Sequence, residues 1–277
     1  IKSLNWKFMS SSTRELRHIV GLSIPVIIAE LGWIFMGVVD TIMVGHLGPS
    51  AIGAVSIGGI LFDAFGIFGI GLVLGLDTLV SQAFGAGRLR QCDHWLWQGL
   101  WLSAFVAPML MLGMLVLPPL MRASGVHGGV LSLAVPYLKT LIPSLVPLLI
   151  YAAFRRYLQG MGGVRPVMFA LVSAKGVNVL GNWLLIPQFG VEGAGWATFW
   201  SRMYMAAVLA TYTVARHSAI LRNISRPEYA DIRELLRLGV PAAGQILLEV
   251  GVFATATVLA GRLHPEALAA HHVVLNI

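Results

Sequence analysis

Apolar stretches long enough to cross a bilayer dominate the chain, and this feature limits the folds that it can adopt. Charged residues separate seven whole stretches, and an eighth begins at residue 267. A backbone segment in lipid must satisfy its own hydrogen bonds, so about 20 apolar residues cross as a helix. The whole spans are expected near residues 19–44, 51–80, 95–117, 130–154, 166–187, 193–215 and 238–261. The sequence therefore predicts an all-α polytopic membrane protein.

Composition excludes the main soluble classes. Only 11% of the residues are charged and 57% are hydrophobic, whereas a soluble domain carries about 25% charged residues. A soluble enzyme, a nucleic-acid-binding module and a disordered chain are therefore excluded. The single cysteine, Cys92, excludes a disulfide framework, and the eight histidines show no spacing typical of a zinc site.

The basic residues predict the orientation of the spans. The N-terminal segment and every second loop after it hold fourteen Lys and Arg residues, whereas the opposite loops hold only Arg122 and Arg262. Cytoplasmic loops of membrane proteins carry the excess of Lys and Arg, so we expect a cytoplasmic N-terminus.

A repeat six spans apart predicts two lobes. With an offset of 216 residues, ten identities fall in residues 17–54, against about 3–4 expected by chance, and they include Pro25 with Pro241 and Gly45 with Gly261. An even offset gives two halves of the same orientation, as in transporters. The alternative is that proline and glycine arose independently at matching positions of membrane helices, without a duplication.

The expected organisation follows from the spans and the repeat. Residues 1–18 have no apolar core and no cleavage site, which predicts a cytoplasmic leader rather than a secretory signal. We expect a six-helix lobe over 19–215, a cytoplasmic linker over 216–237 and the start of a second lobe over 238–277. The last eleven residues are apolar and stop in mid-pattern, so the chain is expected to be a piece cut inside a helix.

Five acids fall within or at the ends of spans, where each costs about 2.5–3.5 kcal/mol at a helix centre. They are Glu30, Asp40, Asp63, Asp77 and Glu249. Glu30 is expected to pair with Lys175 or Arg202. Asp77 is expected to be solvated or to cap a helix. Asp40 and Glu249 are favoured as functional groups, and binding of H⁺ or Na⁺ would neutralise their charge. The alternative is that each is a hydrogen-bonded carboxyl with a purely structural role.

Two asparagines share one face of the fifth span. Asn178 and Asn182 are four residues apart, and Lys175 extends the same stripe. Their amide oxygens can bind a bare cation or their amides can bond to a carboxyl. Hydrogen bonding between helices is the equally weighted alternative.

Several motifs in chain order resemble those of the multidrug and toxic compound extrusion (MATE) transporters. The first-helix motif consists of Pro25, Val39-Asp40-Thr41 and residues 45–48 (GHLG). The others are residues 78–87 (TLVSQAFGAG), residues 154–160 (FRRYLQG) with Arg165-Pro166, residues 178–182 (NVLGN), Gly190 with residues 195–198 (GWAT), and Pro241 with Glu249. The last pair is similar to the seventh helix of the bacterial NorM-type branch.

The resemblance implies twelve helices in two six-helix lobes and a V-shaped central cleft. It implies a non-enzymatic antiporter of the bacterial inner membrane that exports organic, mostly cationic compounds against Na⁺ or H⁺. Cation coupling falls on Asp40, Asn178, Asn182 and Glu249, with substrate contacts at Asp40 and Glu249 and a possible Na⁺ site at Asp40, Asn178 and Asn182. Some branches have an acid at the position of Asn182, which leaves the preferred ion open.

The same resemblance sets the expected partners and the competing function. Small organic cations and membrane lipids are the expected partners, without nucleic acid or a cofactor other than the coupling ion, and the full-length protein is expected to be a monomer. The alternative function is a flippase for a lipid-linked sugar, as in relatives of the same superfamily. The five intramembrane acids outnumber the three intramembrane bases, which favours cationic cargo.

Cysteine labelling tests the predicted orientation. A cysteine at Ser50, in a Cys92→Ser background, is expected to react with an impermeant thiol reagent in cells with a permeabilised outer membrane. A cysteine at Arg222 is expected to react only after the inner membrane is lysed. The reverse pattern would overturn the assignment of spans.

Overall fold

The computed structural model describes residues 23–24, 27, 42–119 and 128–263, with the side chains of residue 250 and residues 253–263 excepted. Most of the first predicted span, with Glu30 and Asp40, lies outside the described residues, as do the predicted leader and the partial eighth span. The described residues form helices and no strand, as the sequence predicts.

The helices coincide with the second to seventh predicted spans. They are α2 (Pro49–Val73), α3 (Gly75–Gly85), α4 (Leu89–Leu115), α6 (Gly128–Leu141), the 3₁₀ turn η1 (Ile142–Ser144), α7 (Leu145–Gly160), α8 (Val164–Phe189), α9 (Val191–Arg216), the 3₁₀ turn η2 (Ser218–Leu221) and α10 (Tyr229–Leu263). Among the described residues, the stretches 49–85, 89–119, 128–160 and 164–189 are long and apolar enough to cross a membrane. The division into leader, lobes and linker stays a prediction.

Proline and glycine set several helix boundaries. Pro49 is the first residue of α2, where its missing N–H costs no hydrogen bond. Pro143 lies in the 3₁₀ turn between α6 and α7, so one predicted span is two helices in line. Gly190 has φ +59°, a backbone conformation that favours glycine, and it alone separates α8 from α9. The two helices therefore form a tight antiparallel hairpin.

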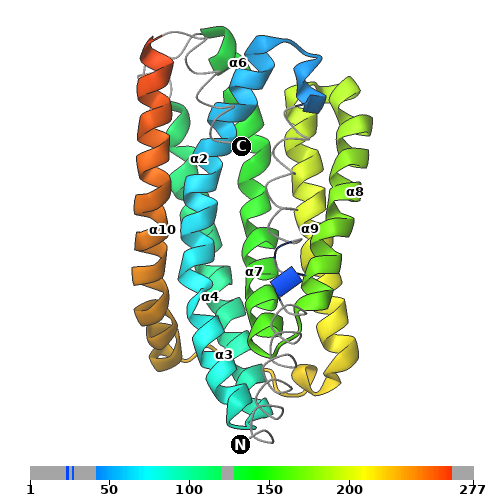
Figure 1. The fold of residues 1–277 in the computed structure, drawn as a ribbon, viewed down its shortest axis with the longest axis vertical. Helices are drawn as coiled ribbons and strands as arrows, with labels where there is room; N and C mark the ends of the chain where they lie inside the picture. The colour runs from blue at the N-terminus through cyan, green and yellow to red at the C-terminus, as the bar shows by residue number, and fades with distance from the viewer. Residues whose placement is uncertain (1–22, 25–26, 28–41, 120–127, 264–277) are drawn as a thin grey trace, which may run out of the picture.

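The helices form an elongated bundle with α7 at its centre (Figure 1). Helix α7 packs against α4 on one side and α9 on the other, and α2 packs against α6 and α10. Leu145, Leu149 and Ala153 on α7 are fully buried. Figure 1 places α10 at one edge of the bundle and α8 at the other.

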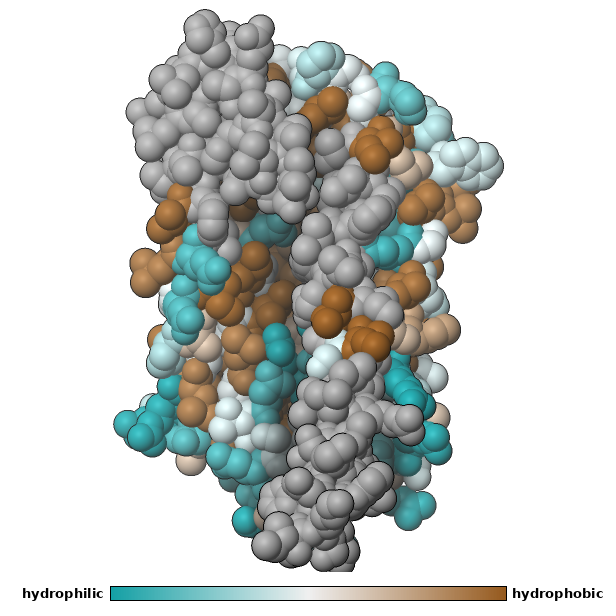
Figure 2. All heavy atoms as spheres, in the orientation of Figure 1, coloured by the Kyte–Doolittle hydropathy of each residue, from teal (hydrophilic) through white to brown (hydrophobic). Residues whose placement is uncertain are grey.

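One end of the bundle collects the loops that carry the predicted cytoplasmic basic residues. The end of α3, the end of α7 and the start of α10 lie together there (Figure 1). Arg156 Nη1 forms an ion pair with Asp77 Oδ2 at 2.9 Å, which joins α7 to α3 at this end. On the face shown in Figure 2, hydrophilic residues gather toward the same end. The common end agrees with the predicted alternation of the spans, and the compartment that it faces stays a prediction.

Helix α10 approaches α2 closely at small residues. A Cβ atom on Gly71 would lie 2.7 Å from Ala243 Cβ, and one on Gly239 would collide with the carbonyl of Leu72. Small residues let membrane helices approach until their backbones touch, and dispersion then stabilises the pair. The crossing of α2 and α10 therefore depends on the absence of side chains at Gly71 and Gly239.

Replacing one of these glycines tests the crossing. Gly71→Ala is expected to lower the free energy of unfolding of the full-length protein by about 1–3 kcal/mol, because the new methyl group overlaps α10. Gly59→Ala on the same helix is the matched control, since no atom of the described residues in neighbouring elements lies within 4 Å of its added Cβ. Better helix propensity should make the control neutral or more stable, by up to about 1 kcal/mol. Equal thermal unfolding of the two variants in detergent would contradict the close crossing.

Candidate functional site

The two asparagines predicted to bind a cation are buried in α8. Asn178 is 1% exposed and Asn182 is 0% exposed. The side-chain amide of Asn182 donates to Asn178 Oδ1 at 3.5 Å, so the two groups share one face as their spacing predicts.

This face of α8 packs against α9. Ser201 Oγ donates to the carbonyl of Ala174 at 2.9 Å. A Cβ atom on Gly181 would lie 2.9 Å from Ala197 Cβ. The first contact lies before Asn178 in α8 and the second lies after it. Because α8 and α9 are antiparallel, Thr198 of α9 is expected at about the same height along the bundle as Asn178.

Thr198 adds a hydroxyl group to this buried polar region. Its side chain is 5% exposed, and Thr198 Oγ1 donates to the carbonyl of Ala194 at 3.0 Å. A hydroxyl oxygen that donates its proton still has lone pairs with which to accept a hydrogen bond or bind a cation. No sequence pattern distinguishes Thr198 as a site residue, because a threonine that bonds to its own helix is common in membrane spans.

Asn178 retains a hydrogen-bond donor that the described residues do not use. The amide nitrogen of Asn178 is buried and has no hydrogen-bond partner among the described residues. A buried donor without a partner costs about 1–3 kcal/mol. The arrangement therefore suits an additional acceptor, such as a carboxylate, beside amide oxygens that can bind a hard cation. Asp40, the carboxylate predicted to share this site, lies outside the described residues.

Arg202 anchors the end of this polar region on α9. Arg202 Nη1 donates to Ser144 Oγ at 2.6 Å, and the guanidinium carbon lies 4.2 Å from the ring centroid of Phe62. Its charge also acts on the carboxylate of Asp63, the next residue of α2. The predicted partner of Arg202, Glu30, lies outside the described residues. The contacts of Arg202 with Ser144 and Phe62 were not predicted from the sequence.

Glu249 lies on an exposed face of α10, apart from the buried asparagine pair. Its side chain is exposed, on a part of α10 where Leu248 and Val252 are also exposed. Because α10 and α8 occupy opposite edges of the bundle in Figure 1, the structure does not bring Glu249 to the asparagine pair. The described site residues therefore form two separate groups.

The sequence missed one further intramembrane pairing. Asp77 was predicted to be solvated or to cap a helix, and its side chain is half-exposed at the first turn of α3. Its ion pair with Arg156 joins residues 79 positions apart, and no local pattern indicates such a pair.

Comparison with known proteins relates the chain to one protein family. The sequence profile of the MatE family matches residues 25–184. The chain is 31% identical to the probable multidrug resistance protein NorM of Geobacillus kaustophilus and 32% identical to that of Pseudomonas putida, over 94% and 96% of its own length. The chain spans about 60% of the length of both relatives.

Two solved structures share the fold. The eukaryotic MATE transporter AtDTX14 superposes with a TM-score of 0.80 at 24% identity, over 94% of this chain and 59% of the other. A MOP superfamily transporter from Pyrococcus furiosus superposes with a TM-score of 0.77 at 23% identity, over 93% and 60%. The likeness supports a polytopic all-α membrane fold.

Substitution of Arg202 tests its structural role. Arg202→Met is expected to lower the free energy of unfolding by about 2–4 kcal/mol, because it removes a charged hydrogen bond and a cation–π contact. The control is Arg216→Met, at the exposed end of the same helix, where a loss below about 1 kcal/mol is expected. Thermal unfolding of the purified full-length protein measures both, and equal losses would show that the buried contacts of Arg202 contribute nothing.

Proposed function

Because the chain belongs to the MatE family, we propose that the whole protein is a Na⁺- or H⁺-coupled antiporter that exports organic, mostly cationic drugs and toxic compounds. The relatives named as probable multidrug resistance proteins support export of drugs. The observation that carries cation coupling is the buried asparagine pair of α8, in which no described residue accepts a hydrogen bond from the amide nitrogen of Asn178. We further propose a multi-pass monomer in the bacterial inner membrane with a cytoplasmic N-terminus.

In the first lobe, Asp40, Asn178 and Asn182 bind the coupling cation. The two amides supply neutral oxygens, and the carboxylate of Asp40 supplies the charge that a bare cation needs. The amide nitrogen of Asn178, which has no partner among the described residues, is suited to hold this carboxylate in place. Cation binding then offsets the high cost of an isolated carboxylate away from water.

In the second lobe, Glu249 supplies the other exchangeable charge. Its exposed position on α10 lets it meet a diffusing cation, whereas a residue in the α2–α10 crossing could not. Asp40 and Glu249 both contact the cationic cargo. A carboxylate that gives up one positive charge in a poorly hydrated cleft must take another, so cargo and coupling cation compete. This competition is reciprocal, and it exchanges one cation for the other.

Neutralising the two acids tests the mechanism. In the full-length protein, Asp40→Asn and Glu249→Gln should keep size and hydrogen bonding but remove the exchangeable charge. Each variant is expected to fold and to lose most of its ion-driven efflux of ethidium. The measurement is efflux from energised vesicles that hold equal amounts of each variant, driven by a Na⁺ gradient and by a pH gradient in turn.

The control for this experiment is Glu192→Gln. Glu192 is exposed in the first turn of α9, and its neutralisation should leave efflux near the wild-type rate. Wild-type efflux by both Asp40→Asn and Glu249→Gln would contradict the exchange mechanism. A gradient that drives the wild-type protein identifies the coupling ion.

A further inference from the structure

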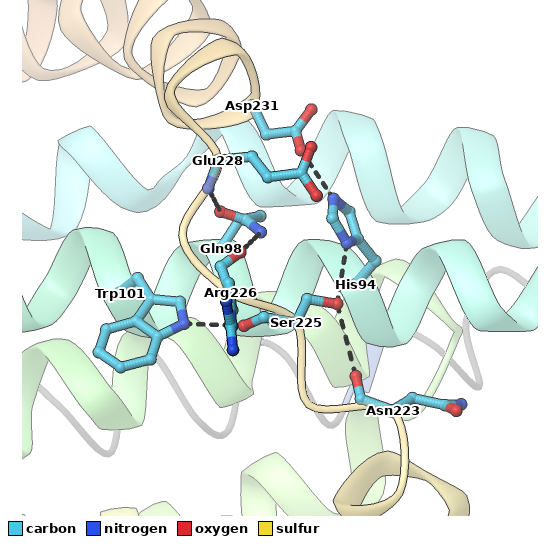
Figure 3. Close-up of polar contacts among 8 residues, drawn as sticks. All are labelled: His94, Gln98, Trp101, Asn223, Ser225, Arg226, Glu228 and Asp231. Carbon is cyan, nitrogen blue, oxygen red and sulfur yellow. Dashed lines mark hydrogen bonds and ion pairs between the residues drawn. The ribbon is translucent and has the colours of Figure 1, made fainter.

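Tryptophan side chains of α4 bind the segment that joins α9 to α10, residues 217–228. Trp97 Nε1 donates to the carbonyl of Ile220 at 3.1 Å. One turn along α4, Trp101 Nε1 donates to the carbonyl of Ser225 at 2.9 Å. The second of these bonds is drawn in Figure 3. Both bonds are made to the backbone, so they fix the path of residues 217–228 along α4.

Gln98 fixes the same segment just before α10 begins. Its amide nitrogen donates to the carbonyl of Arg226 at 2.7 Å, and its amide oxygen accepts the backbone N–H of Glu228 at 3.0 Å. Gln98 is fully buried, and both of its bonds appear in Figure 3. The backbone that carries the Glu228 side chain is therefore held in a defined place.

Three side chains that commonly bind metals meet beside this anchored backbone. His94 of α4, Glu228 and Asp231 each offer one ligand atom, and these atoms lie within 4.8 Å of one another. Figure 3 shows the imidazole of His94 turned toward the two carboxylates at the start of α10. His94 Nε2 lies 2.7 Å from Asp231 Oδ2.

Both ring nitrogens of His94 have polar neighbours. Ser225 Oγ lies 2.9 Å from His94 Nδ1 and 3.4 Å from the carbonyl oxygen of Asn223. In the tautomer in which Nδ1–H donates to Ser225 Oγ, a neutral ring presents a lone pair at Nε2. A metal ion bound to this lone pair would replace the hydrogen bond that Nε2–H otherwise donates to Asp231.

The charge of the cluster suits a divalent ion. Glu228 and Asp231 are two carboxylates whose ligand atoms lie within 4.8 Å of each other and of a ring nitrogen of His94. Within the described part of the chain, Glu228 forms no ion pair that could offset its own charge. One imidazole nitrogen with two carboxylate oxygens is a donor set that suits divalent first-row metals. A bond from Nδ1–H to Ser225 Oγ would hold the imidazole with Nε2 toward the ion, as such a bond commonly does in metal-binding histidines.

We propose that His94, Glu228 and Asp231 bind one divalent transition-metal ion, of the class of Zn²⁺ or Mn²⁺, at the junction of α4 and α10. The ion ties the first turn of α10 to a helix of the first lobe. The site is separate from the asparagine pair and from Glu249, and its existence does not depend on the transport function proposed above.

Cobalt titration of the full-length protein in detergent, after removal of bound metal with a chelator, tests the site. Wild-type protein is expected to bind one Co²⁺, detected by calorimetry and by visible absorbance. His94→Ala and Asp231→Asn should weaken binding by about tenfold or more. The control is His217→Ala, because His217 is exposed and outside the cluster, and it should bind Co²⁺ as the wild type does.

A milder variant keeps the test decisive if the first two disturb folding. Glu228→Gln leaves the contacts of His94 with Ser225 and Asp231 in place, and it should also weaken Co²⁺ binding by about tenfold. Absence of Co²⁺ binding by folded wild-type protein would overturn the proposal, since a proton then suffices for the cluster. Unchanged binding in all three variants would overturn it as well. Ethidium efflux of metal-free protein, measured in parallel, reports separately on the transport function.

Discussion

A lipid bilayer offers no hydrogen-bond partners, and the internal arrangement of this bundle depends on that constraint. Several polar side chains within the described helices find a partner on another element of the bundle, as with Arg202 on Ser144 and Ser201 on the backbone of Ala174. Tyr157 of α7 likewise donates to Asp93 of α4 at 2.8 Å. Each such bond fixes the rotation of one helix against another. The side-chain amide nitrogen of Asn178 differs from these groups, because no described residue accepts a hydrogen bond from it.

The sequence predicted the helices well because the bilayer sets their length. A stretch of about 20 apolar residues has few alternatives to a spanning helix, and the predicted spans at 95–117 and 166–187 fall within α4 with its extension and within α8. The shared face of Asn178 and Asn182 follows from the helical period alone. Membership in the MatE family confirms the resemblance that the motifs indicated.

Contacts between distant helices could not be predicted, because hydropathy gives the length of a helix and not its rotation or its neighbours. The ion pair of Asp77 with Arg156 is of this kind. So is the cluster of His94 with Glu228 and Asp231, in which more than 130 residues separate the histidine from the carboxylates. The spacing of the histidines along the chain does not indicate this cluster, because its other two members are carboxylates far away in sequence. The grouping of Asp40 with the asparagines and the lobe boundaries stay predictions.

The single-residue turn at Gly190 has a consequence for the order in which the bundle assembles. Helices α8 and α9 are neighbours in sequence, so little chain entropy is lost when they pack, and they can do so as soon as both have entered the membrane. The crossing of α2 with α10 joins segments at opposite ends of the described chain. Synthesis proceeds from the N-terminus, so the glycine face of α2 must wait for α10. During that interval Gly71 and its neighbours face lipid or another helix, and this surface is the part of the nascent bundle most open to wrong pairing.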